Sequence, residues 1–300
     1  MIVAEYPRKQ IRHALANNGV GLRVGPLNIK VLSTLPAMLD GICSLYSDYS
    51  VDLQGEFFDF HIRVFTPAGL RRWIRPQVFF SNDDFVPFKP LPVSQAFAFF
   101  EWGVNWCVSQ YIHNHLILHA AVVEKDGRAV IMPAAPGSGK STLCSALILS
   151  GWRLLSDEMA MVRLSDGQIT PIPRPVSLKN ESIPLLQNFS PDSFISRPTF
   201  DTAKGTVAHL KPPTESVAAA QTLVKPAWII APKYIPAATA NLEPSTKGKT
   251  MMMAVQNSFN YSVLGSAGFD ALVSLVDCCQ CYNYSYSSLD DAVSTFQTLQ

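Results

Sequence analysis

The residues with the clearest chemical meaning lie between positions 129 and 143. An apolar run, Ala129–Met132, leads into a short segment of Pro, Ala, Gly and Ser, and a helical pattern begins at Lys140. A buried strand, a tight loop and a helix N-terminus let backbone N–H groups and the helix dipole converge on phosphate oxygens. The segment matches the phosphate-loop pattern G-x-x-x-x-G-K-[ST], except that Ala134 replaces the first glycine. Alanine fits there if its φ is negative, so the sequence predicts a phosphate-binding loop.

Each residue type in this loop has an expected task. Lys140 is expected to reach the β- and γ-phosphates of a nucleoside triphosphate, and the Ser141 hydroxyl to bind Mg²⁺. ATP and Mg²⁺ are therefore the expected cofactors. The expected nucleotide-binding residues are Ala135, Pro136, Gly137, Ser138, Gly139, Lys140, Ser141 and Thr142.

An acidic pair, Asp157 and Glu158, follows the short apolar run 152–155. A strand that comes after the loop helix is expected to neighbour the loop strand, which places its carboxyl end where open α/β sheets bind ligands. One carboxylate can then position the metal, while the other accepts a proton from an attacking hydroxyl. The alternative is an acidic turn at the surface. The apolar residues on both sides of the pair favour the active-site interpretation.

Three features together resemble the catalytic domain of HPr kinase/phosphorylase. These are a hairpin bearing His119, the phosphate loop, and an acidic pair seventeen residues after Lys140. The chain is more similar still to bacterial HPr-kinase-related proteins, particularly the group called HprK-related kinase A, whose further motifs look like residues 171–179 and 204–213. The resemblance covers about residues 115–235. It implies a phosphate-loop domain related to phosphoenolpyruvate carboxykinase.

The resemblance also implies residue roles. Lys140 and Ser141 match the phosphate-loop lysine and its metal-binding hydroxyl, and Asp157 matches the catalytic base that acts on a serine hydroxyl. Glu158 stands where HPr kinase has a second Asp, so it is expected to bind metal. His119 matches a histidine near the phosphates, on the strand before the loop; a lone histidine of this kind can equally be a satisfied core residue.

Arg174 lies between two prolines, which hold it in an extended segment. Arginine suits the clamping of transition-state charge, so Arg174 is expected to act on the transferred phosphoryl group. A surface arginine is the alternative. The Arg- and Gly-rich segment that follows the acidic pair in HPr kinase is absent here, and Pro-Arg-Pro stands in its place.

A second set of polar residues is a candidate acceptor site or lid. It reads as a glycine-containing loop with flanking basic side chains, although a plain polar connector between strands explains the same pattern. Its members are Lys179, Lys204, Gly205, Thr206 and His209.

The expected architecture is α/β, with a P-loop kinase domain of the HPr kinase/phosphoenolpyruvate carboxykinase type at residues 93–300. A smaller α+β region at residues 1–92 precedes it, and its sequence does not indicate a role. A long, almost uniformly apolar helix is expected at 93–112, and an irregular excursion at 180–200. The Gly248-Lys249-Thr250 triplet mimics a phosphate loop but lacks the preceding glycines and strand, so we interpret it as coincidence.

Composition limits the classes of partner that this protein is expected to bind. The formal net charge is +1 and the hydrophobic fraction is 48%, which allows a large core and argues against a nucleic-acid partner. The short basic run at residues 71–75 reads as a solvated strand face. No apolar signal core is found at the N-terminus, and Glu101 and Asn105 interrupt the longest apolar stretch, so no membrane partner is expected. Six cysteines without disulfide-framework spacing favour a reduced, cytoplasmic location.

The sequence thus predicts an ATP-dependent kinase that moves the γ-phosphoryl group to a hydroxyl-bearing acceptor, expected to be a serine of a peptide or small protein. A small-molecule hydroxyl is one alternative. A nucleotide-gated ATPase or binding protein is another, although neither an Asn-Lys-x-Asp nor a Leu-Ser-Gly-Gly-Gln motif is found. HPr kinase-like enzymes often assemble, so a homo-oligomer stays open.

Overall fold

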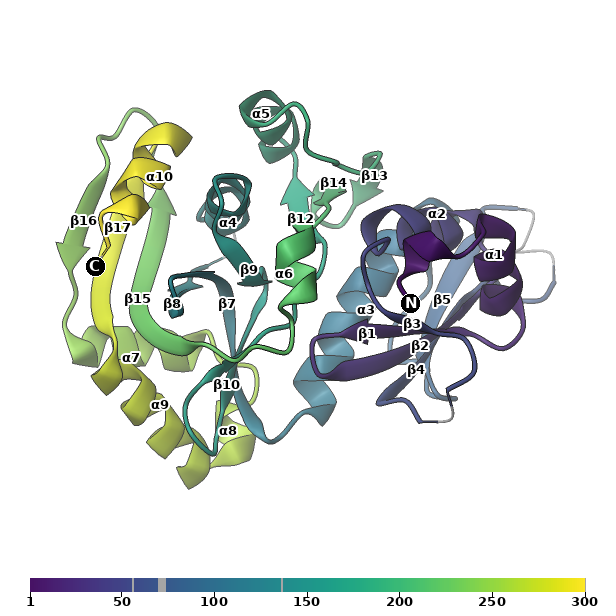
Figure 1. The fold of residues 1–300 in the computed structure, drawn as a ribbon, viewed down its shortest axis with the longest axis horizontal. Helices are drawn as coiled ribbons and strands as arrows, with labels where there is room; N and C mark the ends of the chain where they lie inside the picture. Colours follow the sequence, from purple (N-terminus) through teal and green to yellow (C-terminus); the bar gives the residue numbers. More distant parts are fainter. Residues whose placement is uncertain (56, 70–73, 136, 300) are drawn as a thin grey trace.

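The computed structural model describes residues 1–55, 57–69, 74–135 and 137–299. Pro136 of the phosphate loop and residues 71–73 of the basic run lie outside this part of the chain. The described residues form a mixed α/β protein with several sheets, in which an N-terminal and a C-terminal sheet each carry their own helices (Figure 1). None of the helices in these ranges is both long and apolar enough to cross a membrane.

The N-terminal part is built on a mixed sheet. In the described residues this sheet has the strand order β3-β1-β2-β4-β5-β6, with β2 and β4 parallel. Its strands are β1 (Val20–Val24), β2 (Leu27–Ser33), β3 (Val51–Asp52), β4 (Phe60–Phe65), β5 (Gln77–Asn82) and β6 (Leu91–Pro92). Its helices are η1 (Val3–Glu5), α1 (Arg8–Ala16), α2 (Pro36–Leu45), η3 (Val93–Gln95) and α3 (Ala96–Tyr111). Strands β1 and β2 form a hairpin, in which Gly25 turns the chain with φ +57°.

The long apolar helix expected at 93–112 is confirmed as η3 and α3. It shares a core with the N-terminal sheet, where Phe99, Phe100 and Val104 pack with Phe80. Gly103 makes this contact possible: a Cβ at that position would come within 2.1 Å of the Phe80 ring. The helix therefore presents one face to the N-terminal sheet and leaves its other residues to meet the C-terminal part.

The C-terminal part holds a larger sheet and a small one. Over the described residues their strand orders are β11-β10-β7-β8-β15-β17-β16, with β9 paired to β7, and β12-β14-β13. The large sheet consists of β7 (His115–Lys125), β8 (Arg128–Pro133), β9 (Arg153–Ser156), β10 (Met159–Arg163), β11 (Ile169–Thr170), β15 (Lys225–Tyr234), β16 (Asn241–Pro244) and β17 (Gln280–Tyr286). The small sheet consists of β12 (Val176–Lys179), β13 (Thr199–Thr202) and β14 (Gly205–Leu210).

Helices cover both faces of the large sheet (Figure 1). Ala121 and Val123 of β7 pack with helices α4 and α10, whereas Leu118 and Val122 pack with α7 and α9. Burial on both faces explains why this strand reads as an almost continuous apolar run. The helices of this part are α4 (Lys140–Leu149), α5 (Ser182–Phe189), α6 (Thr214–Ala218), α7 (Lys247–Gln256), α8 (Tyr261–Leu264), α9 (Ser266–Cys278) and α10 (Leu289–Gln297).

The position of β9 differs from the expectation. The hairpin partner β7 occupies one side of the loop strand β8, and β15 lies parallel on its other side, so β9 pairs with β7 instead. Because β7 is antiparallel to both β8 and β9, these two strands run in the same direction. Val122 pairs with Ile131 of β8 and with Ser156 of β9, which puts the two strands at matching heights. The acidic pair therefore still emerges at the same edge of the sheet as the phosphate loop.

The irregular excursion expected at 180–200 is wrong in part, because it contains helix α5. Pro184 and the surrounding serines look like helix breakers, but proline in the first turn lacks only a donor that the helix would not use. Ile183 and Leu186 then bury one face of the helix against the C-terminal core. Tertiary packing thus outweighs the local signal.

Candidate functional site

The phosphate loop has the backbone conformation that its glycines predict. Gly137 and Gly139 adopt φ of +84° and +89°, whereas Ala134 is not among the residues with positive φ. The backbone N–H of Ser138 donates to the Ala135 carbonyl at 3.2 Å. Helix α4 then begins at Lys140, with Thr142 in its first turn.

Two tyrosines fix the loop from the sheet. The Tyr234 N–H donates to the Ser138 carbonyl at 2.8 Å, and the Tyr286 hydroxyl donates to the Gly139 carbonyl at 2.9 Å. They come from β15 and β17, which run parallel to the loop strand. The loop is therefore tied to the sheet on the side away from β7.

Gly139→Ala is expected to distort this loop. At this position the loop backbone would hold alanine at a left-handed φ. The new Cβ would also lie 2.5 Å from the Tyr286 hydroxyl oxygen. We expect a loss of about 1–3 kcal/mol in unfolding free energy, the usual cost of such backbone strain. Urea unfolding measures this loss. Gly248→Ala is the control, since its Cβ would meet nothing within 4 Å; equal stability of the two variants would contradict the assigned strain.

Lys140 is buried, at 7% exposure, and its Nζ has no hydrogen-bond partner among the described residues. The Ser138 hydroxyl oxygen is also buried and has no hydrogen-bond partner among these residues. Burial lowers the pKa of Lys140, while the carboxylates of Asp157 and Glu158 act against that shift. A buried ammonium group without a partner is expensive, so its position indicates a site for an anion.

Asp157 follows β9 directly and is 6% exposed. Within the described ranges neither of its carboxylate oxygens has a hydrogen-bond partner within 3.5 Å, although the Ser141 side chain lies near enough to favour a lower pKa of Asp157. Burial raises the pKa of Asp157 to about 6; the charge of Lys140 opposes this rise and that of Glu158 adds to it. Lys140 and Asp157 thus act on each other electrostatically without forming an ion pair within 4.0 Å, since none of the ion pairs of the described residues joins them.

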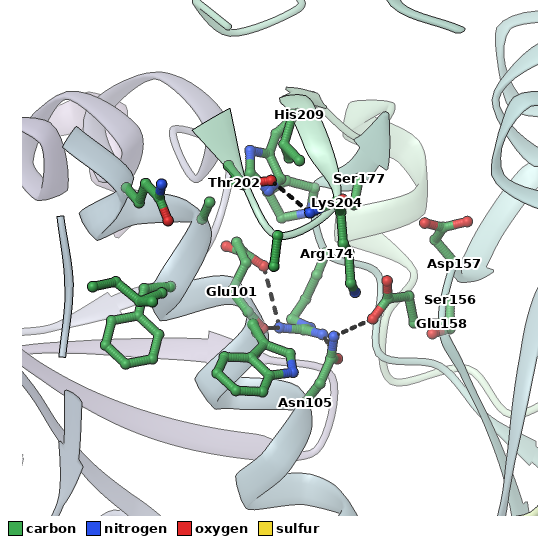
Figure 2. A pocket seen from close by; sticks show the side chains of 18 residues that line it. Glu101, Asn105, Ser156, Asp157, Glu158, Arg174, Ser177, Thr202, Lys204 and His209 are labelled. Atoms are coloured by element: carbon green, nitrogen blue, oxygen red, sulfur yellow. Dashed lines mark hydrogen bonds and ion pairs between the residues drawn. The ribbon is translucent and has the colours of Figure 1, made fainter. Parts of the chain in front are cut away.

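Glu158 belongs to a chain of polar groups that reaches into the N-terminal part. Its carboxylate accepts a hydrogen bond from the Asn105 amide, whose oxygen accepts one from Arg174 (Figure 2). Arg174 also pairs with Glu101 at 3.2 Å, and the Tyr46 hydroxyl donates to Glu101 at 2.6 Å. In the view of Figure 2, Glu158 separates Asp157 from the Arg174 guanidinium. The sequence-predicted clamp residue therefore lies in a buried network that orients Glu158.

The two glutamates of this network have pKa values shifted in opposite directions. Burial favours a higher pKa for Glu158, but the positive charges of Lys204, Lys140 and Lys179 outweigh it and hold the pKa below its usual value. Glu101 is different: burial raises its pKa to about 7 even though Arg174 opposes the shift.

His119 lies on β7, opposite Met159 of β10, and its ring meets Phe259 edge to face at 5.7 Å between centroids. Burial and the charge of Lys140 lower its pKa to about 4. His209 on β14 is also buried, with a pKa of about 4 for the same first reason, and its ring contacts Phe97. Both histidines are therefore neutral at pH 7.

His209→Gln tests this burial through pH. Because the pKa of His209 is lowered from 6.5 to about 4, the unfolded chain binds the extra proton first and the wild type loses stability as pH falls below 6.5. By pH 5 that loss reaches roughly 2 kcal/mol, and the variant does not share it. Urea unfolding at pH 7 and pH 5 should show the stability difference moving in favour of the variant at pH 5. A difference that does not change with pH would contradict a neutral, buried His209.

The remaining predicted residues lie in the small sheet. Lys179 ends β12, and Lys204 lies in the turn between β13 and β14, where Gly205 and Thr206 begin the second strand. The Thr206 N–H donates to the Asn180 side chain at 3.0 Å, and a Cβ on Gly205 would come within 2.3 Å of the same amide oxygen. The small sheet therefore holds Lys179 and Lys204 where their positive charges act on Glu158.

Sequence reasoning missed Glu101, Asn105 and Tyr46. The first two interrupt an otherwise apolar helix, and this was the available signal: a polar residue on an apolar face needs a partner. That partner, Arg174, is far along the chain, so the pairing could not be deduced from local pattern.

Comparison with known families matches residues 104–178, about a quarter of the chain, to a family described as SynChlorMet cassette protein ScmC. The matched segment contains β7, β8, the phosphate loop and the acidic pair, so the similarity coincides with the candidate site. No curated protein shows significant similarity to the chain. The family match corrects the resemblance to HPr kinase and the HprK-related kinase A group, which was wrong: a strand, phosphate loop and following acidic pair are shared chemistry and do not identify one family. What the chain is similar to, over these residues, is the ScmC family.

Proposed function

We propose that this chain is an ATP-dependent phosphotransferase with a phosphate-loop kinase fold, which moves the γ-phosphoryl group to a hydroxyl. The observation that supports it most is that two buried, oppositely charged side chains, Lys140 and Asp157, act on each other electrostatically while neither makes a hydrogen bond within 3.5 Å in the described part of the chain. Burying such groups costs several kcal/mol each unless a ligand completes their interactions. A triphosphate with its metal supplies both kinds of partner.

The proposal gives each of these residues a role. The loop N–H groups and Lys140 hold the β- and γ-phosphates, as at other helix N-termini. The acceptor oxygen forms a bond to the γ-phosphorus while the bond to the β–γ bridging oxygen breaks, and ADP leaves. The hydroxyl proton passes to Asp157, whose pKa of about 6 suits a base that works near neutral pH.

The residues present also fit Mg²⁺. This ion prefers one or two carboxylates together with substrate phosphates, and it supplies neutralisation of the developing charge when bound. The described residues contain no cluster of three or more His, Cys, Asp or Glu that could hold a metal alone. Ser141 and Glu158 are the proposed ligands, with the unpartnered oxygens of Asp157 beside them.

Calorimetric titration with Mg-ATP tests the proposal. Lys140→Ala is expected to weaken binding by about 10- to 100-fold, because a charged hydrogen bond contributes roughly 1.5–3 kcal/mol. Lys249→Ala is the matched control, since this exposed lysine lies in the look-alike triplet within α7. Failure of the wild type to bind, or equal binding by Lys140→Ala, would refute nucleotide binding at this loop.

A further inference from the structure

A cavity of about 300 Å³ opens beside the acidic pair, between the N-terminal and C-terminal parts. Asp157 and Glu158 line it, whereas none of the described residues of the phosphate loop does. The acidic pair therefore forms a boundary: Asp157 acts on Lys140 on one side and borders this cavity on the other. Figure 2 shows the labelled polar residues around the space, which come from α3, the 156–158 segment, the small sheet and, at Arg174, the segment that leads into that sheet.

The wall that faces the acidic pair is apolar and comes from the N-terminal part. Leu91, Ala98, Phe99 and Trp102 line it. The Trp102 ring packs against Phe88 with centroids 4.2 Å apart and against Phe99 at 5.8 Å. These contacts hold the ring in place, so the wall is a preformed surface.

Most polar groups of the cavity are already used by one another. Glu101, Arg174 and Asn105 are joined in the buried network, and His209 is neutral. The positive charge of Lys204, which also lines the cavity, acts on the negative charge of Glu158. Asp157 borders the cavity with both carboxylate oxygens buried and without a hydrogen-bond partner within 3.5 Å in the described part of the chain. An occupant therefore meets apolar surface over most of its body, with the Asp157 carboxyl at the edge of the cavity.

We propose that this cavity is the acceptor subsite, and that it takes a hydroxyl carried on a compact, uncharged apolar or aromatic group. The inference rests on the proposed phosphotransferase function. A volume near 300 Å³ lies at the lower end of ligand sites, which favours a compact group. A polyol would leave its other hydroxyl groups against the apolar wall without partners, at a cost that disfavours it. The N-terminal part thereby sets acceptor specificity.

A hydroxyl on such a group can belong to a free alcohol or to a side chain within a short peptide. Ligand-observed NMR titrations of the full chain distinguish them with three probes: 2-phenylethanol, the capped peptide acetyl-Phe-Ser-Phe-amide, and glycerol. We expect saturable binding of 2-phenylethanol or the peptide, and at least about tenfold weaker binding of glycerol, since aromatic burial is the main contribution. The probe that binds identifies whether the hydroxyl belongs to a free alcohol or to a peptide.

Variants locate the binding. Ala98→Phe, which fills the cavity, and Trp102→Ala, which removes its wall, should each weaken the probe at least about tenfold. Trp106→Ala is the control, because Trp106 lies one turn along α3 and does not line the cavity. Retained Mg-ATP binding shows that the variants are folded.

Two results would overturn the inference: glycerol binding as tightly as the apolar probes, or neither apolar probe showing saturable binding that Ala98→Phe removes. Both can occur while Mg-ATP still binds at Lys140, in which case the subsite fails and the proposed function stands. Loss of Mg-ATP binding in the wild type is the separate failure of the proposed function.

Discussion

Asp157→Asn protein is expected to bind Mg-ATP as well as the wild type or more tightly, and to lose about 10²- to 10⁴-fold in phosphotransfer rate, the usual contribution of a general base. Asparagine keeps the shape of the side chain but cannot accept the hydroxyl proton. It also removes a negative charge that faces the triphosphate, so affinity does not fall. The rate is measured as transfer of label from γ-labelled ATP to acceptors in a lysate of the source cell.

Asp166→Asn is the control for that measurement. Asp166 is exposed and pairs with Arg163, away from the candidate site. Unchanged transfer by Asp157→Asn would remove Asp157 from the mechanism. Fast hydrolysis of ATP by the wild type without any acceptor would instead favour a nucleotide-gated ATPase.

Arg174→Met is expected to lower the free energy of unfolding by about 3–5 kcal/mol at pH 8, since it leaves the Glu101 carboxylate buried without its cation. The loss should shrink as pH falls below 7, because burial already raises the pKa of Glu101 to about 7 and the lone carboxyl protonates more easily still. Urea unfolding at pH 8 and pH 6 measures both effects.

Two further variants test whether the unpaired Glu101 charge causes this loss. Arg163→Met breaks an exposed ion pair and should change stability little. The double variant Glu101→Gln/Arg174→Met removes both charges and should recover part of the loss. If Arg174→Met is as stable as the wild type but inactive in phosphotransfer, then Arg174 acts on the phosphoryl group, as its position between two prolines first suggested.

Local pattern predicted the elements around the loop well. The hairpin that bears His119, the strand that leads into the loop and the start of α4 at Lys140 are confirmed. Each depends on residues adjacent in the chain: a turn signal, an apolar run, and glycines that adopt positive φ. The helix at 93–112 was predictable for the same reason.

The missed features depend on pairing between distant segments. The placement of β9 beside β7 was not deducible, because periodicity does not say which strand a strand joins. The network from Tyr46 through Glu101 to Arg174 joins residues more than fifty positions apart at each step. The cavity likewise exists only where α3 meets the small sheet, so neither segment indicates it alone.

We propose that the phosphate loop and the acidic pair act on one triphosphate from opposite sides. A crystal structure of the protein with Mg²⁺ and a non-hydrolysable ATP analogue would test this arrangement. We expect the γ-phosphate between the Lys140 ammonium and the Asp157 carboxylate, with the side of Asp157 away from Lys140 facing the cavity that Trp102 lines. A nucleotide bound elsewhere, or one whose γ-phosphate lies out of reach of Asp157, would contradict it.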